Sequence, residues 1–130
     1  GIHMSYREKA QAMQEQMGQG QIMEAFEKYY AENCQITEKP TGEVRDGKAA
    51  QRAAIQQWFG MVKEFHGGGV NSITSDEEAG VTMVESWSEI TFQDGKRVKM
   101  EEVAVQKWEG DQIAAESFYY HMPMQPQNGN

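Results

Sequence analysis

The sequence is poor in cysteine, proline and positive charge, and each shortage excludes a class of protein. It has one cysteine and three prolines in 130 residues, and 12 basic residues against 20 acidic ones. Cys34 alone cannot form an internal disulfide, which suits a reducing compartment, so we expect a cytoplasmic protein. The net charge of −8 repels phosphate groups, which argues against nucleic acid and anionic membranes as partners. No apolar run approaches the ~20 residues of a membrane span, and no secretory signal is evident at the start.

The length predicts a single domain. A chain of this size can bury about two-thirds of its unfolded surface, so its stability requires no disulfide or structural metal. Residues 1–3, ahead of Met4, resemble a cloning remnant and are set aside. Residues 122–130 contain two prolines and an Asn-Gly pair without periodicity, and we expect a flexible tail there. The domain is therefore expected to span residues 4–121.

Helical patterns occupy the first half of the chain. Ser5–Met17 is rich in good helix formers, and a second helix is predicted over Gln21–Glu32 with one apolar stripe. A third helix is predicted over Lys48–Phe65, after a polar loop at Thr41–Gly47. We expect its buried side to consist of Ala54, Ile55, Trp58, Phe59, Val62 and Phe65. The run Gly67–Gly69 is interpreted as a hinge that ends this helix.

Extended patterns occupy the second half. Alternating runs separated by Asp94-Gly95 and Gly110-Asp111 predict three antiparallel strands, because Asp-Gly pairs favour tight hairpin turns. We expect these long strands at Gly80–Gln93, Lys96–Glu109 and Gln112–His121, a fourth at about Val70–Asp76 and a short fifth at Cys34–Lys39. The fold class is therefore α+β, with three helices covering one face of a curved, mostly antiparallel sheet.

Two-residue turns would determine which side chains share a face. They would pair Trp87 with Glu102, and Glu102 with Tyr119. The resulting Trp87 face carries three glutamates and no basic residue, together with aromatic side chains, Met100 and one imidazole: Glu85, Trp87, Glu89, Glu102, Tyr119 and His121. A slip of one residue at either turn would exchange faces between strands, although parity within each strand would survive.

Both faces are about half apolar, so each needs a cover. The helices can cover one face. We expect a second subunit to cover the other, which predicts a homodimer through Val84, Val103, Val105, Phe118 and Tyr120.

Several segments together resemble a known family. They are the run Ala25–Ala31, the loop end Asp46-Gly47-Lys48, and the closing segments 110–113 and 116–120. The chain resembles the SnoaL-like group of the nuclear transport factor 2-like superfamily, which has a cystatin-like α+β cone. The resemblance implies a deep pocket between a curved sheet and a long helix, and dimers formed through the sheet. Members include polyketide cyclases, ketosteroid isomerases, dehydratases, epoxide hydrolases and proteins of no known activity. The catalytic set of a steroid isomerase is not matched residue by residue, so no specific activity is transferred.

The candidate site is the Trp87 face. A glutamate in an apolar pocket has a raised pKa and can exchange a proton near neutrality, so Glu102 is the candidate base. Tyr119 and His121 are the candidate proton donors. The candidate ligand-binding residues are Trp87, Glu85, Glu89, Trp58, Phe59, Tyr30, Phe26 and Met100. The alternative is that the glutamates are exposed, or are paired with Arg52, Lys48 or Lys63.

We expect no cofactor and no metal, because His66 and His121 have no His or Cys partner at ligand spacing, and a carboxylate–histidine metal site on the Trp87 face is the weaker alternative. The leading hypothesis is a protein that binds a small apolar molecule, and whether it is an enzyme is left open. As an enzyme it would be a lyase, isomerase or cyclase that transfers a proton next to a carbonyl. The alternatives are a non-catalytic ligand-binding or dimerisation module and a regulatory protein–protein module.

Overall fold

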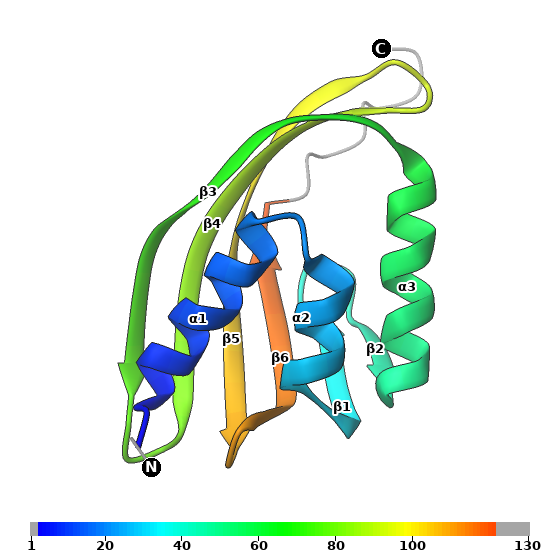
Figure 1. Ribbon diagram of the computed structural model, residues 1–130. Helices are drawn as coiled ribbons and strands as arrows, with labels where there is room; N and C mark the ends of the chain where they lie inside the picture. Colours follow the sequence, from blue (N-terminus) through cyan, green and yellow to red (C-terminus); the bar gives the residue numbers. More distant parts are fainter. Residues whose placement is uncertain (1–2, 122–130) are drawn as a thin grey trace.

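The computed structural model describes residues 3–121, in which three helices lie against one curved six-stranded sheet (Figure 1). This arrangement confirms the α+β prediction. The elements are α1 (Tyr6–Gly18), α2 (Ile22–Tyr29), β1 (Tyr30–Glu38), β2 (Glu43–Asp46), α3 (Lys48–Met61), β3 (Val62–Asp76), β4 (Val81–Phe92), β5 (Arg97–Glu109) and β6 (Gln112–Tyr120). The tail predicted at 122–130 lies outside the described residues. Within residues 3–121, no helix has the length and apolar character needed to cross a bilayer.

The strand order is β2-β1-β6-β5-β4-β3, and the pairs are antiparallel except for the parallel pair β1–β6. The sheet therefore has one strand more than predicted. The extra strand, β2, lies in the segment predicted to be a loop, and it pairs with the end of β1 through Glu38 and Glu43.

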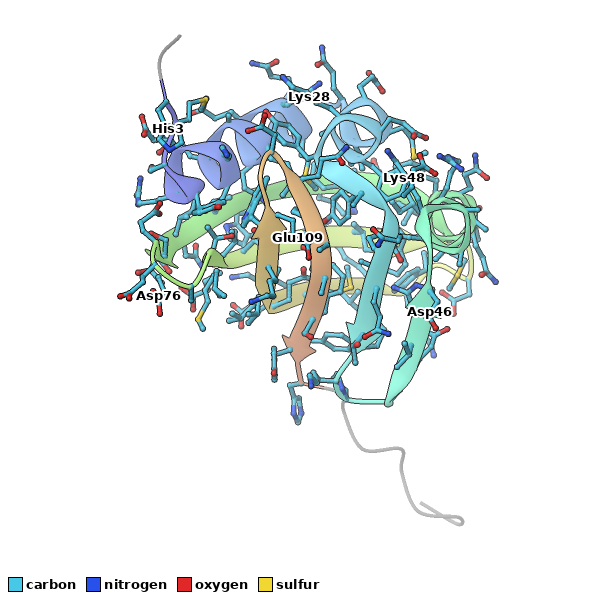
Figure 2. All side chains as sticks on the ribbon, turned by 90° about the horizontal axis from the view of Figure 1, so that it is seen from below. His3, Lys28, Asp46, Lys48, Asp76 and Glu109 are labelled. Atoms are coloured by element: carbon cyan, nitrogen blue, oxygen red, sulfur yellow. The ribbon has the colours of Figure 1, made fainter. Side chains whose placement is uncertain are left out.

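The core lies between the sheet and the two N-terminal helices, where side chains fill the space in Figure 2. Its buried members come from α1, α2 and four strands: Ala10, Met13, Ala25, Phe26, Tyr29, Tyr30, Cys34, Ile36, Val84, Trp108 and Ile113. The start of α1 is fixed twice. Ser5 and Glu8 form a capping box, and Glu77 from the β3–β4 turn accepts hydrogen bonds from two further backbone N–H groups, at 2.8 and 3.0 Å.

Helix α3 differs most from its prediction. It ends at Met61 because Val62 is already extended, and three of its expected core residues are exposed: Trp58 by 36%, Phe59 by 42% and Phe65 by 66%. The buried residues of α3 are instead Lys48 and Gln51. The prediction was wrong because polar contacts at its N-terminal turns anchor this helix, rather than an apolar stripe.

These contacts join α3 to α2. Lys48, labelled in Figure 2, donates from Nζ to the Glu27 carbonyl oxygen at 2.7 Å, and Arg52 binds the Glu27 carboxylate at 2.6 and 2.9 Å. Toward its C-terminus, Trp58 meets Phe92 edge-on at 5.5 Å between ring centroids.

The glycine run is part of β3 rather than a hinge. Gly67 and Gly69 pair with Glu89 and Trp87 of β4, and the Trp87 indole occupies the space where side chains of β3 would stand. A Cβ on Gly69 would lie 3.0 Å from Trp87 Nε1. The hinge prediction was wrong because the strand dispenses with side chains here to accommodate this indole.

The register of the hairpins also differs from the prediction. The backbone N–H of Phe92 donates to the Lys96 carbonyl at 2.8 Å, so the first loop has three residues, ending in Gly95 at φ 89°. Ser86 therefore pairs with Glu102, and Trp87 pairs with Glu101.

The second turn begins as predicted, with Glu109 opposite Gln112. An irregularity beside Trp108 then shifts the register by one residue, so that Tyr120 rather than Tyr119 pairs with Glu102.

The two shifts redistribute side chains between the faces. The helix-facing side carries Val84, Ser86, Ile90, Val98, Met100, Glu102, Ala104, Glu116, Phe118 and Tyr120. The outward side carries Met83, Glu85, Trp87, Glu89, Glu101, Val103, Val105 and Tyr119. The residues predicted to form one dimer surface are therefore divided, because Val84, Phe118 and Tyr120 lie on the helix-facing side and Val103 and Val105 on the outward side.

Candidate functional site

Glu102 lies on the helix-facing side of β5, between Ser86 of β4 and Tyr120 of β6. It is partly buried, and it makes no hydrogen bond or ion pair within residues 3–121. Burial raises the pKa of Glu102 to about 7, and the nearby charge of Glu38 contributes to the same shift. An unpaired carboxyl group with this pKa can bind and release a proton under ordinary conditions.

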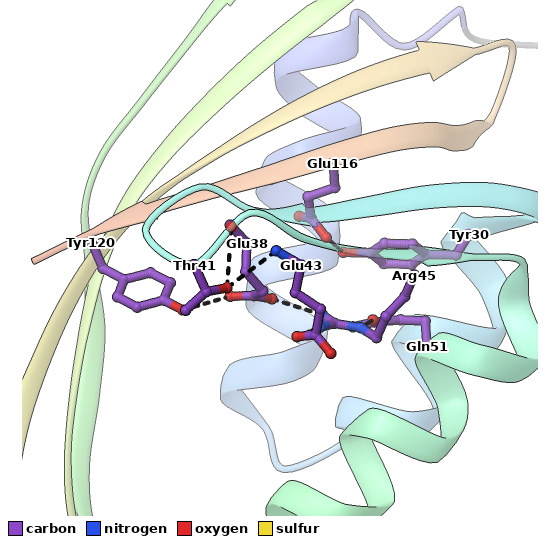
Figure 3. Close-up of polar contacts among 8 residues, drawn as sticks. All are labelled: Tyr30, Glu38, Thr41, Glu43, Arg45, Gln51, Glu116 and Tyr120. Atoms are coloured by element: carbon purple, nitrogen blue, oxygen red, sulfur yellow. Dashed lines mark hydrogen bonds and ion pairs between the residues drawn. The ribbon is translucent and has the colours of Figure 1, made fainter. Parts of the chain in front are cut away.

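Glu38, the last residue of β1, binds one residue of β6 and one of β2 (Figure 3). Its Oε1 accepts a hydrogen bond from the Tyr120 hydroxyl at 2.9 Å, and its Oε2 binds Arg45 at 2.7 Å. Arg45 also donates to Gln51 of α3 at 2.7 Å and to Glu43 at 2.8 Å. Burial, followed by the contact with Glu38, raises the pKa of Tyr120 to about 12.

A second acidic group lies deeper. Glu116 is buried and accepts hydrogen bonds from the Tyr30 hydroxyl and, at 2.9 Å, from Gln106 Nε2. The Thr82 hydroxyl donates a hydrogen bond to Gln106 Oε1 at 2.8 Å. The same hydroxyl accepts a hydrogen bond from Trp108 Nε1 at 2.8 Å. Burial raises the pKa of Glu116 to about 7, although the two donors act to lower it. Burial also raises the pKa of Tyr30 well above its ordinary value, and Glu116 adds to this effect.

The three carboxyl groups therefore differ in what they can do. Glu38 is held by Arg45 and Tyr120, and Glu116 is held by Tyr30 and Gln106. Glu102 has no such partner within residues 3–121. Apolar side chains share its face of the sheet: Ile90, Val98, Met100 and Phe118.

The sequence-predicted residues fall into separate places. Glu102, Met100 and Tyr30 are on the helix-facing side, with Tyr30 bound to Glu116. Phe26 is buried in the core, with its ring centroid 5.0 Å from that of Tyr30. The predicted contacts Trp58 and Phe59 are exposed on α3.

The other predicted residues lie on the outward side, because of the register shifts. Trp87 rests on the β3 glycines with Lys99 at 5.2 Å from its ring, and Glu85 accepts from Ser72 at 3.2 Å. Glu89 is paired with Arg97 at 2.6 Å, rather than with a helix cation. The structure does not bring these three residues to Glu102.

The predicted donors also point elsewhere. Tyr119 is exposed, with Lys39 5.7 Å from its ring centroid, and His121 is exposed after the end of β6. Tyr119 pairs with Val103 on the outward side, and His121 lies beyond the last paired residue of β6.

Four residues of the Glu102 surroundings were not foreseen: Glu38, Arg45, Glu116 and Tyr120. Alternation along β6 places Glu116 and Tyr120 on the same face, but the assumed register put that face opposite to the one that carries Glu102. No sequence signal identified Glu38 and Arg45, because their strand pairing depends on β2.

A groove of about 340 Å³ lies away from this cluster, between Arg7, Gln11, Gln14 and Glu15 of α1 and residues 70–73 of β3. Over residues 3–121, no three His, Cys, Asp or Glu side chains are arranged to hold a metal ion.

Comparison with known proteins agrees with this architecture. The sequence model of the SnoaL-like domain matches residues 4–120. A Mesorhizobium loti protein provisionally assigned as a SnoaL-like polyketide cyclase is 30% identical, with a TM-score of 0.78 over 90% of this chain and 100% of that one.

More distant structures share the fold. A Pseudomonas putida protein provisionally assigned as a polyketide cyclase is 17% identical, with a TM-score of 0.77 over 92% of this chain and 94% of that one. An NTF2-like protein of unknown function from Burkholderia pseudomallei is 14% identical, with a TM-score of 0.73 over 91% and 92% of the two chains. Among proteins with curated descriptions, none matches. The family model spans nearly the whole described domain, and the chain therefore belongs to the SnoaL-like family.

Proposed function

We propose that this protein binds a small apolar carbonyl compound on the helix-facing side of the sheet and transfers a proton next to the carbonyl group. The observation that carries the proposal is Glu102, an unpaired and partly buried carboxyl group whose pKa is raised to about 7. The provisional assignments of the Mesorhizobium loti and Pseudomonas putida proteins as polyketide cyclases support the same reaction class. An isomerase, a cyclase or a dehydratase would each use this step.

In this reaction the ionised Glu102 removes a proton from the carbon beside the carbonyl. The electrons of the broken C–H bond form an enolate, and the protonated Glu102 returns the proton to carbon or oxygen. The enolate oxygen needs a hydrogen-bond donor, and Tyr120 lies opposite Glu102. Its hydroxyl would turn from Glu38 to the ligand, a role that the sequence had suggested for Tyr119 or His121.

The test is deuterium incorporation from D₂O into 2-tetralone, an apolar ketone with an acidic C–H bond, followed by proton NMR. The protein should accelerate the exchange, and Glu102→Gln should lower the protein-dependent rate by about 100-fold, the scale of general base catalysis. Glu101→Gln is the matched control, because Glu101 is the exposed neighbour on the outward side. The proposal is wrong if Glu102→Gln exchanges as fast as Glu101→Gln, or if the protein does not accelerate the exchange.

The alternative is a ligand-binding or dimerisation module without catalysis. The outward side of the sheet favours it, because Met83 and Tyr119 are 44% and 47% exposed there and lie near Val103 and Val105. A symmetric dimer through this side would have twice the 14.7 kDa mass of the chain when measured by light scattering. Val103→Lys should then give the monomer mass, whereas a monomeric wild-type protein would rule this dimer out.

A further inference from the structure

Arg45 binds side chains from three elements. Its guanidinium binds Glu38 of β1, Glu43 of its own strand β2 and Gln51 of α3, and its side chain is 15% exposed. Glu38 is 17% exposed, while Glu43 is 58% exposed. The inner of the two ion pairs is therefore shielded from solvent, which strengthens it.

Glu38 has a donor at each of its two carboxylate oxygens. A carboxylate accepts hydrogen bonds at both oxygens without donating, and both Glu38 oxygens meet donors: the Tyr120 hydroxyl and the Arg45 guanidinium. Gln51 and Glu43 fix the orientation of Arg45, so the negative charge of Glu38 has a defined place.

The effect of the Glu38 charge on Glu102 depends on the other charged groups nearby. The titratable or charged side chains associated with this side of the sheet come from β1, β2, β5 and β6: Tyr30, Cys34, Glu38, Glu43, Arg45, Glu102, Glu116 and Tyr120. The cations of α3, Lys48 and Arg52, bind Glu27 and not this cluster. Glu102 pairs across the strands with Tyr120, whose hydroxyl is bound to Glu38, and no basic side chain within residues 3–121 forms an ion pair with Glu102.

We propose that Glu38 is a positioning residue of the Glu102 site, which places one fixed negative charge beside Glu102 and leaves Glu102 as the group that exchanges a proton with the ligand. This inference rests on the proposed function and adds its regulation. Repulsion between like charges favours the protonated form of Glu102, so ligand-coupled proton transfer is centred near neutral pH rather than in the acidic range. The raised pKa of Glu102, caused first by burial and then by Glu38, supports the argument from geometry.

The test is the pH titration of the Glu102 carboxyl carbon by NMR in ¹³C-labelled protein without ligand, with the signal assigned by its loss in Glu102→Gln. Glu38→Gln removes the charge and keeps the shape, so the Glu102 midpoint should fall by roughly one pH unit. The control is Glu43→Gln, which removes a charge from the same arginine on its exposed side, and it should leave the midpoint unchanged. A purely structural role of Glu38 would lower stability without moving the midpoint.

Two further outcomes decide the matter. An unchanged midpoint in Glu38→Gln, or an equal fall in Glu43→Gln, overturns the proposal. Should Glu38→Gln fail to fold, the wild-type protein still tests the proposal, because the Glu102 midpoint should fall when added salt screens the repulsion from Glu38. A Glu102 midpoint that does not change with salt would contradict a charge beside Glu102.

The titration separates this inference from the proposed function, since it needs no ketone. If Glu38→Gln lowers the Glu102 midpoint but the protein does not exchange deuterium into 2-tetralone, the result counts against the proposed function alone. If the protein exchanges deuterium but Glu38→Gln leaves the Glu102 midpoint unchanged, the result counts against the role of Glu38 alone.

Discussion

Glu102 and Glu116 are the same residue type on neighbouring strands, and burial raises both pKa values to about 7. Their partners distinguish them. Glu116 is bound by Tyr30 and Gln106 in a buried network, whereas Glu102 has no bound partner within residues 3–121. The first arrangement is that of a structural acid, and the second is the one on which the proposed function rests.

These pKa values predict how stability depends on pH. Between about pH 4.5 and pH 7 the unfolded chain has lost both protons while the folded chain retains them, so the free energy of unfolding falls as pH rises. Their contribution is fully present below about pH 4.5 and is lost as pH passes through 7. The loss should be about 3 kcal/mol per group at most, and smaller for Glu102 because it is partly exposed.

Urea unfolding from about pH 5 to about pH 8 measures this effect. Glu116→Gln should flatten the pH dependence because it cannot ionise, and Glu101→Gln should leave it unchanged. A free energy of unfolding that is constant or rises across this range would contradict the assignment of both groups.

Residue-level prediction from the sequence stopped at the register between strands. Alternation grouped Glu102 with Met100, and Glu116 with Tyr120, but the relation between strands depended on one residue in each hairpin. Gln93 enters the first loop, and an irregularity beside Trp108 shifts the second hairpin. Each shift moves side chains to the other face, so Trp87 and Tyr119 were associated with Glu102 in error.

Among the elements, α1 and the last three strands could be predicted within a few residues, because their local patterns agree with their environment. Helix α3 could not, since its apolar spacing suggested burial while Lys48, Gln51 and Arg52 anchor it through polar contacts. The strand β3 was missed in part because glycine usually interrupts a strand, and the Trp87 indole that leaves little room for a side chain at Gly69 lies on β4.

The packing of β3 predicts that alanine substitutions at its glycines differ in their cost to stability. A Cβ on Gly68 would lie 3.0 Å from the Trp87 carbonyl oxygen, which is fixed in the strand backbone, and 3.2 Å from the Phe65 ring. Gly68→Ala should therefore lower the free energy of unfolding by about 1–3 kcal/mol. At Gly67 the nearest atom is a Trp87 ring carbon at 3.6 Å, an ordinary contact, so Gly67→Ala should change stability little.

Urea unfolding of the two variants side by side checks this. Equal losses, or a larger loss for Gly67→Ala, would show that the position of Trp87 against β3 is wrong.

At the scale of the whole molecule, the alternating pattern predicted the α+β class, and the family resemblance predicted the cone. The parallel pairing of β1 with β6 joins segments about 80 residues apart, between Ile36 and Glu116, and no local pattern encodes such a pair. That pairing brings Glu38 to Tyr120 and so completes the surroundings of Glu102. The cluster is thus a product of the topology, which explains why the sequence pattern alone identified only part of it.

The most direct measurement is the pH titration of the Glu102 carboxyl carbon in the wild-type protein. The structure predicts a midpoint near pH 7, because burial and the charge of Glu38 both oppose ionisation. A midpoint near 4.5, the ordinary value for glutamate, would show that Glu102 is a solvated surface acid, and the proposed proton transfer would lose its base.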